Sequence, residues 1–233
     1  MPPLKIKLHE GFVCDKSRTW RQHEHTPHLR QGSVDAASAH LCMFMALTLL
    51  GIASKDDIRS LRHGTDYLFG ATWTRSLESF FTGANSAEVL DLLRTLKGQV
   101  AFHTASGSTM HTLDFARRGL NRNDLVILGL ECEGRSGKRW TLGVGTESLT
   151  KGSRSDTTSI LCLDPGEAPP SVAQFNARLR LNSPRRGSRQ LHYAVPGAIQ
   201  SVSCDFAICL RALARRSKSR VRVESESARD AIR

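Results

Sequence analysis

Residues 35–51 have the sequence DAASAHLCMFMALTLLG, the strongest helical pattern in this chain. Large apolar residues recur at every fourth position from Leu41 onward, which is the spacing of one face of an α-helix. Asp35 is a residue type that caps helix N-termini, and Gly51 is one that ends helices. Because small or apolar residues also occupy the other faces, we predict a central, buried helix.

The elements around this helix are weaker and change in type along the chain. Two further helices are predicted at residues 54–62 and 86–97. Short β-rich runs follow at residues 125–132, 140–146, 159–164, 191–195 and 199–203. Helices followed by consecutive strands indicate an α+β domain in which the central helix packs on an antiparallel sheet.

Length and composition favour one folded domain with flanking segments. The chain has 233 residues, of which 39% are hydrophobic and 24% charged, a globular balance. We expect an irregular N-terminal segment at 1–34, a domain at 35–210 and a basic tail at 211–233. The tail is too polar to form a core, so we predict that it is disordered.

The net charge of +11 is concentrated in two segments. Residues 178–189 contain five Arg and no acid, and residues 211–233 contain eight Lys or Arg against three acids. Aromatic residues make up only 6% of the chain, whereas nucleic-acid-binding surfaces mix basic and aromatic side chains. We therefore expect solvated basic segments and no nucleic-acid partner.

The six cysteines form no tight Cys-x-x-Cys pair, which favours a reducing compartment over a disulfide framework or a zinc ribbon. No run of eighteen apolar residues could span a membrane, and the N-terminus has no apolar signal region. His23, His25 and His28 lie in a polar stretch without the frame that a metal site needs. We expect a cytoplasmic chain with no metal and no cofactor. The sequence does not predict an oligomeric state.

Three blocks of sequence resemble a known family. DAASAHLCMFMAL (35–47), RWTLGVG (139–145) and ILCLDPGEAPP (160–170) are similar to the nucleophile, base and orienting segments of the bacterial double-glycine leader peptidases and their stand-alone relatives. The blocks occur in the family's order and together span about residues 28–170. The resemblance implies a papain-like cysteine peptidase fold.

The resemblance also implies a role for four positions. Ser38 falls on the nucleophilic Cys, Arg139 on the base His, Asp164 on the orienting Asp, and Gln31 on the Gln that lines the oxyanion hole. Two of these residues do not suit the chemistry. A serine at this place needs a strong neighbouring base, and a guanidinium stays protonated in proteins. Arg139 and Asp164 are expected to form a plain ion pair.

Because the residues at both the nucleophile and the base positions are replaced, we predict a peptidase-like protein that is catalytically inactive. It is expected to keep a cleft for a peptide or protein segment. One alternative is an active hydrolase that uses Ser38, or a cysteine enzyme presented as its Cys→Ser form at this position, with His103 or His111 as the base. Another is a basic adaptor for an acidic partner. Cys42, one turn after Ser38, is predicted to be a packed small hydrophobe rather than a displaced nucleophile.

Overall fold

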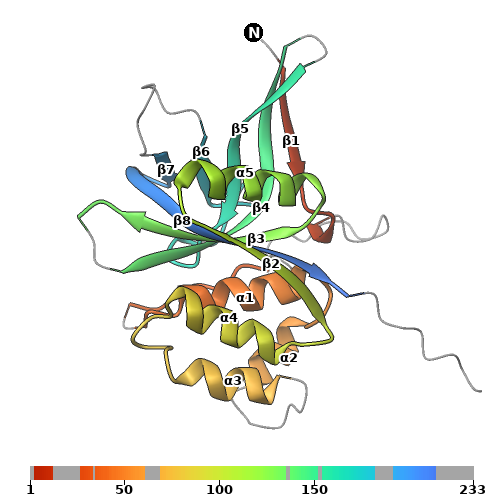
Figure 1. The fold of residues 1–233 in the computed structure, drawn as a ribbon, viewed down its shortest axis with the longest axis vertical. Helices are drawn as coiled ribbons and strands as arrows, with labels where there is room; N and C mark the ends of the chain where they lie inside the picture. Colours follow the sequence, from red (N-terminus) through yellow and green to blue (C-terminus); the bar gives the residue numbers. More distant parts are fainter. Residues whose placement is uncertain are drawn as a thin grey trace, which may run out of the picture.

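The computed structural model describes residues 3–12, 27–33, 35–60, 69–134, 137–151, 154–181 and 191–213. Four helices form one layer, and the strands with a fifth helix form the rest (Figure 1). The helices of the layer are α1 (Ser38–Leu49), α2 (Lys55–Ser60), α3 (Gly70–Leu77) and α4 (Ser86–Thr95). A short 3₁₀ turn, Glu10–Phe12, follows the first strand.

Six antiparallel strands close into a barrel. They are β3 (Leu125–Cys132), β4 (Lys138–Lys151), β5 (Arg154–Leu163), β6 (Ala177–Arg180), β7 (Leu191–Val195) and β8 (Ala198–Ala212). The order β4-β3-β8-β7-β6-β5 is closed by pairing between β5 and β4. Two further strands extend the barrel, with β1 (Leu4–Leu8) on β4 and β2 (Val100–Ser106) on β8.

The length and bulges of β4 make this closure possible. Its N-terminal half pairs with β3 and most of its length pairs with β5. The register against β5 shifts between Gly143 and Gly145 and again between Glu147 and Ser148. Such bulges bend and twist a strand, so that β4 can pair with β3 along one edge and with β5 along the other and close the barrel. Gly145 also lies so close to β1 that a Cβ would clash with that strand.

The barrel interior is one hydrophobic core. Inward-facing side chains of the barrel strands alternate with outward-facing ones, as closure requires. Those that fill the interior include Val126, Leu128, Ile160, Cys162, Leu179, Tyr193 and Cys204. Helix α5 (Thr109–Asn121) adds Leu113, Ala116 and Leu120 to the same cluster, so it packs over this core (Figure 1).

A second core lies between the barrel and the helical layer. Ten of the twelve residues of α1 are buried, as expected for a helix that is apolar on nearly every face. The outward-facing residues of β3, β4 and β8 complete this core, among them Ile127, Trp140, Leu142 and Ile208. Helix α4 adds Val89 and Leu93 to the same core. The start of α1 is thereby held against one end of the barrel.

The predicted papain-like fold is wrong. It requires a helix packed on a sheet, whereas the sheet here closes through the β4–β5 pairing into a six-stranded barrel with two extra strands. Alternation along a strand has the same period in an open sheet and in a barrel, so the local pattern does not distinguish them. The interpretation as a peptidase or hydrolase depended on that fold, so the barrel argues against it as well.

The predicted boundaries also change at both ends. Residues 4–8, inside the segment predicted to be irregular, form β1 on β4, and β8 continues to Ala212, inside the predicted tail. Residues 214–233 and 182–190 lie outside the described residues. They hold most of the Lys and Arg of the two basic segments. In the part of the chain that is described, no helix has the length and apolarity needed to cross a membrane.

Candidate functional site

A polar cavity of about 830 Å³ opens where the start of α1 meets one end of the barrel. It includes all four positions singled out from the sequence: Gln31, Ser38, Arg139 and Asp164. The other lining residues come from the loop before α4, from the strands and from the turn after β5: Gly32, Ala36, Thr82, Gly83, Ala84, Asn85, Cys132, Gly137, Lys138, Gly166, Glu167 and Gln200. Residues far apart in sequence therefore meet in one hollow.

Ser38 is the first residue of α1 and is only 8% exposed. Its Oγ accepts a hydrogen bond of 3.4 Å from the backbone N–H of Trp140, which places the start of the helix against β4. The N-cap is Ala37 and not the predicted Asp35. The Asp35 carboxylate instead accepts from the N–H groups of Gly32 and Ala37, so it stabilises the turn that leads into α1.

Arg139 and Asp164 form the expected ion pair, with Arg139 Nε 2.7 Å from Asp164 Oδ2. Arg139 Nη2 also donates to Glu167 Oε1 at 2.6 Å, and Nη1 lies 3.5 Å from Gln200 Oε1. The guanidinium stacks over the Tyr193 ring at 5.4 Å. Burial, the largest single cause, lowers the pKa of Arg139, but the charge of Asp164 and the hydrogen bonds to Asp164 and Glu167 together outweigh it, so the pKa is raised. Arg139 is therefore a permanent cation.

Asp164 is fully buried and all its polar atoms are engaged. Its Oδ2 accepts from Tyr193 OH at 2.6 Å as well as from Arg139, and its Oδ1 accepts from Gly166 N at 2.8 Å. Asn176 bonds both its N–H and its carbonyl group. Burial, followed by the charge of Asp164, raises the pKa of Tyr193 well above its usual value, so the phenol stays a donor.

Gln31 lines the cavity, but its amide is turned toward its own loop. Nε2 donates to the backbone carbonyl of Asp35 at 2.6 Å, which uses one of the two amide hydrogens. The backbone N–H of Gln31 donates to the carbonyl of Pro165 at 2.7 Å. Gln31 thus connects the segment before α1 to the turn after β5.

Glu167, Gln200 and Lys138 were missed by the sequence reasoning. Glu167 follows Asp164 across an Asp-Pro-Gly turn, in which Glu167 N bonds to the Asp164 carbonyl. That turn signal could have placed the two carboxylates together. Lys138 is paired with Asp205 on β8 at 2.6 Å. Partners on β8 carry no local sequence signal, because they are brought close only by barrel pairing.

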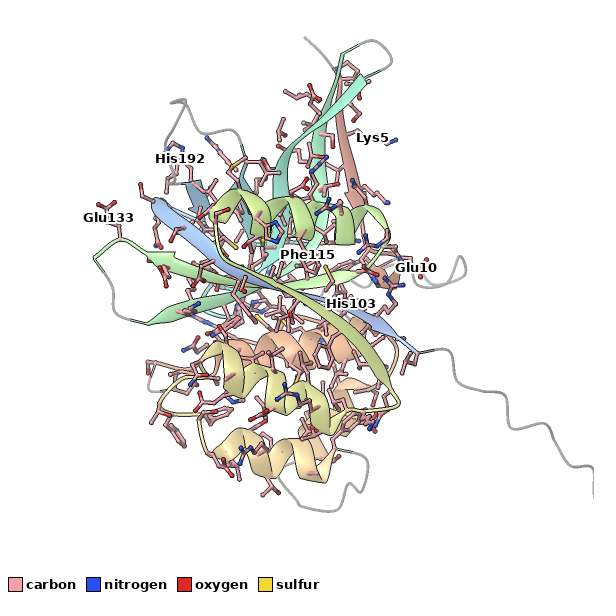
Figure 2. All side chains as sticks on the ribbon, in the orientation of Figure 1. Lys5, Glu10, His103, Phe115, Glu133 and His192 are labelled. Carbon is pink, nitrogen blue, oxygen red and sulfur yellow. The ribbon has the colours of Figure 1, made fainter. Side chains whose placement is uncertain are left out.

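None of the histidines in the described ranges lines the cavity. His103 is exposed on β2 (Figure 2), and His111 is exposed on α5. Because neither lines the cavity with Ser38, neither is placed to serve it as a base. His40 is buried and contacts Ser79 Oγ at 3.1 Å, and His28 contacts the Asp164 carbonyl at 2.9 Å. Residues 23 and 25 lie outside the described residues. Within those ranges, no group of three or more His, Cys, Asp or Glu side chains could hold a metal ion.

Buried thiols of the two cores are not activated. Cys42 is fully buried in the second core, and burial raises its pKa well above the usual value, which confirms the prediction of a packed small side chain. Burial likewise raises the pKa of Cys204 and of Cys209 to about 12. Cys132 lines the cavity, with Sγ 3.7 Å from Gln200 Oε1.

The basic segment at 178–189 is described only in part. Arg178, on β6, pairs with the Glu147 carboxylate at 3.2 Å and stacks over Phe175 at 5.2 Å. This arginine therefore has a structural role on the barrel wall. The adaptor hypothesis rests on the rest of the segment and on the tail, most of which lie outside the described residues.

Comparison with known proteins gives no further guide to the activity, since neither a protein-family profile nor a curated protein matches the chain. The site must be interpreted from its own chemistry. It offers a serine hydroxyl without an adjacent base among the described residues, a cation paired with two carboxylates, and amide groups from separate parts of the wall.

Proposed function

We propose that this chain is a non-catalytic binding protein whose cavity holds a segment of a peptide or of another protein. The observation that carries the proposal is the position of Arg139. This permanently charged side chain is held by Asp164 and Glu167 in the cavity that Ser38 also lines, and no described histidine lines that cavity to accept a proton from the serine. A cavity with that arrangement favours binding over bond cleavage.

The lining suits a peptide main chain. Peptide groups need donors and acceptors in close alternation, and the walls supply amide and hydroxyl groups from Gln31, Ser38, Thr82 and Gln200. Each cation of the described lining is paired, Arg139 with Asp164 and Glu167 and Lys138 with Asp205, so an uncharged main chain suits this wall better than an anionic ligand would. The volume falls within the range of cavities that enclose a compact ligand, which corresponds to a few peptide residues.

A library of acetylated and amidated octapeptides tests the proposal directly. The chain is incubated with the library, the retained peptides are identified by mass spectrometry, and the best of them is titrated calorimetrically. We expect saturable 1:1 binding and recovery of the intact peptide after prolonged incubation. Cleavage that persists in the wild-type chain and disappears in Ser38→Ala would refute the non-catalytic proposal.

A cavity variant and a remote variant locate the binding. Gln200→Ala removes an amide from the wall, and Asp56→Asn changes an exposed residue of α2 that does not line the cavity. Weaker binding in the first and unchanged binding in the second support the cavity as the site. If no member of the library binds, the proposed function fails. A cytoplasmic location stays a prediction from the cysteine content.

A further inference from the structure

Two large apolar side chains are exposed next to the cavity. Leu77, the last residue of α3, is 50% exposed, and Phe81 is 66% exposed. The bonds Ser79 N to the Ser76 carbonyl and Gly83 N to the Ser79 carbonyl continue the winding of the chain past the end of α3. Leu77 and Phe81 are four residues apart in this wound segment and so lie on the same side of it.

The Phe81 ring packs against an aromatic cluster on one side. It packs edge-on against Phe80, with ring centroids 5.5 Å apart. Phe80 in turn contacts Trp73 at 6.2 Å and His40 of α1 at 5.7 Å. The backbone carbonyl of Phe80 accepts from Ala36 N, which ties this segment to the residues just before α1. A ring already packed on a neighbour loses less conformational entropy when a partner covers it than an unsupported ring does.

The apolar pair continues directly into the cavity wall. Thr82, the residue after Phe81, lines the cavity, and so do the three residues that follow it. A chain that lies in the cavity and leaves it on this side passes over Phe81. Two side chains are too small a surface for a stable dimer, which needs about 800 Å² from each copy. The same peptide that fills the cavity is therefore the occupant that fits.

We infer that the bound segment carries one large apolar side chain, Leu, Met or aromatic, that leaves the polar cavity and packs on Phe81 and Leu77. This inference rests on the proposed function and specifies its ligand class. The segment has an amphipathic pattern, with polar or small residues inside the cavity and one apolar anchor outside it. The polar groups of the cavity orient the main chain, and the exposed ring selects the anchor.

A double-mutant cycle tests the contact. The probe is the tightest octapeptide from the library, used as selected and with its apolar anchor residue changed to Ala. We expect Phe81→Ala to raise the Kd of the anchored peptide about tenfold, since burial of one large apolar side chain is lost. The same substitution leaves the Kd of the Ala peptide unchanged. Met110→Ala, which removes a 70% exposed side chain of α5, is the matched control and leaves both Kd values unchanged.

The outcomes separate the two claims. Phe81→Leu restores most of the affinity if apolar contact is what matters. If Phe81→Ala weakens both peptides equally, or neither, the anchor is wrong while peptide binding by the cavity stands. If no library peptide binds, the proposed function fails and the anchor fails with it. Far-ultraviolet circular dichroism of each variant verifies that the exposed positions were changed without unfolding.

Discussion

Tyr193 and Arg139 share one oxygen of a buried carboxylate: the phenol donates to Asp164 Oδ2 at 2.6 Å, and Arg139 Nε donates to the same atom at 2.7 Å. Tyr193 belongs to the barrel interior, whereas Arg139 reaches the cavity. The Asp164 carboxylate is therefore the point at which the barrel core and the candidate site are joined. The positive charge of Arg139 beside this carboxylate therefore supports both the packing of the barrel core and the shape of the cavity.

Removal of Arg139 should destabilise the fold strongly. Asp164 is fully buried, so Arg139→Ala leaves a carboxylate without its cation, which typically costs about 3 kcal/mol or more. Urea denaturation followed by circular dichroism measures the change in the free energy of unfolding. Arg75→Ala, which breaks an exposed pair with Glu78, is the control and is expected to cost less than about 1 kcal/mol.

The partner substitution gives a further check on the same ion pair. Because Asp164→Asn removes the buried negative charge, Arg139→Ala should be less destabilising in the Asp164→Asn background than in the wild-type chain. Equal effects in the two backgrounds would show that the pair is not coupled.

Helix α5 should dock through the close approach of Gly119 to β8. A Cβ at Gly119 would overlap Cys209 Sγ and touch Val126. Gly119→Ala is therefore expected to destabilise the fold by about 1 to 2 kcal/mol through overpacking, although Ala favours helices. In a Cys209→Ala background the overlapping sulfur is gone, so the same substitution should be neutral or stabilising. Thermal unfolding of the four chains measures this reversal, and destabilisation by the same amount in both backgrounds would contradict it.

The fold could be predicted from sequence only as far as its local elements. The strands at 125–132 and 191–195 have the predicted bounds, because each is an apolar run with turn residues on both sides. Closure of the barrel could not be predicted, since it depends on pairing of β4 with both β3 and β5 and on bulges along β4. The four-residue β6, which bridges β5 and β7, is also too short to give a clear pattern.

Four members of the site were predicted, but the framework that brings them together was not. Ser38, Arg139 and Asp164 were singled out through a resemblance to a fold that the chain does not have, yet they do line one cavity. The ion pair was predicted because the same resemblance put Arg139 beside Asp164, and opposite charges at that distance attract. The contributions of Gln200 and Tyr193 depend on where β7 and β8 lie, and no local pattern specifies that position.

Stability should fall on the acid side because of buried histidines. Burial, the largest cause, lowers the pKa of His28 below 6.5; nearby Asp164 opposes this shift, while Arg30 and Lys55 add to it. Burial also lowers the pKa of His40. The unfolded chain therefore takes up protons below about pH 6.5 that the folded chain resists, so the free energy of unfolding decreases as the pH falls below that value.

His28→Gln isolates this effect. The amide can still donate to the Asp164 carbonyl but does not titrate. Urea denaturation between about pH 7.5 and 5.5, on either side of the ordinary histidine pKa, should give a shallower decrease in the free energy of unfolding for the variant than for the wild-type chain. Parallel curves would show that His28 does not contribute to the acid loss.

Ser38→Cys tests whether the cavity can activate a nucleophile. The new thiol lies beside Trp140 N and near a guanidinium already engaged by two carboxylates, with no histidine among the described lining residues. We therefore expect iodoacetamide to alkylate it only at alkaline pH, with a midpoint at or above that of an ordinary thiol, about 8.5, because the position is nearly buried. Peptide mapping by mass spectrometry separates the introduced thiol from Cys132, the other thiol at the cavity, and the wild-type chain supplies the background.

Arg139→His in the same chain places an imidazole beside Asp164 and should move the midpoint of the introduced thiol toward neutral pH, because an imidazolium stabilises a thiolate. Fast alkylation of the single Ser38→Cys chain well below about pH 8 would reveal an activated thiolate and would contradict the non-catalytic function.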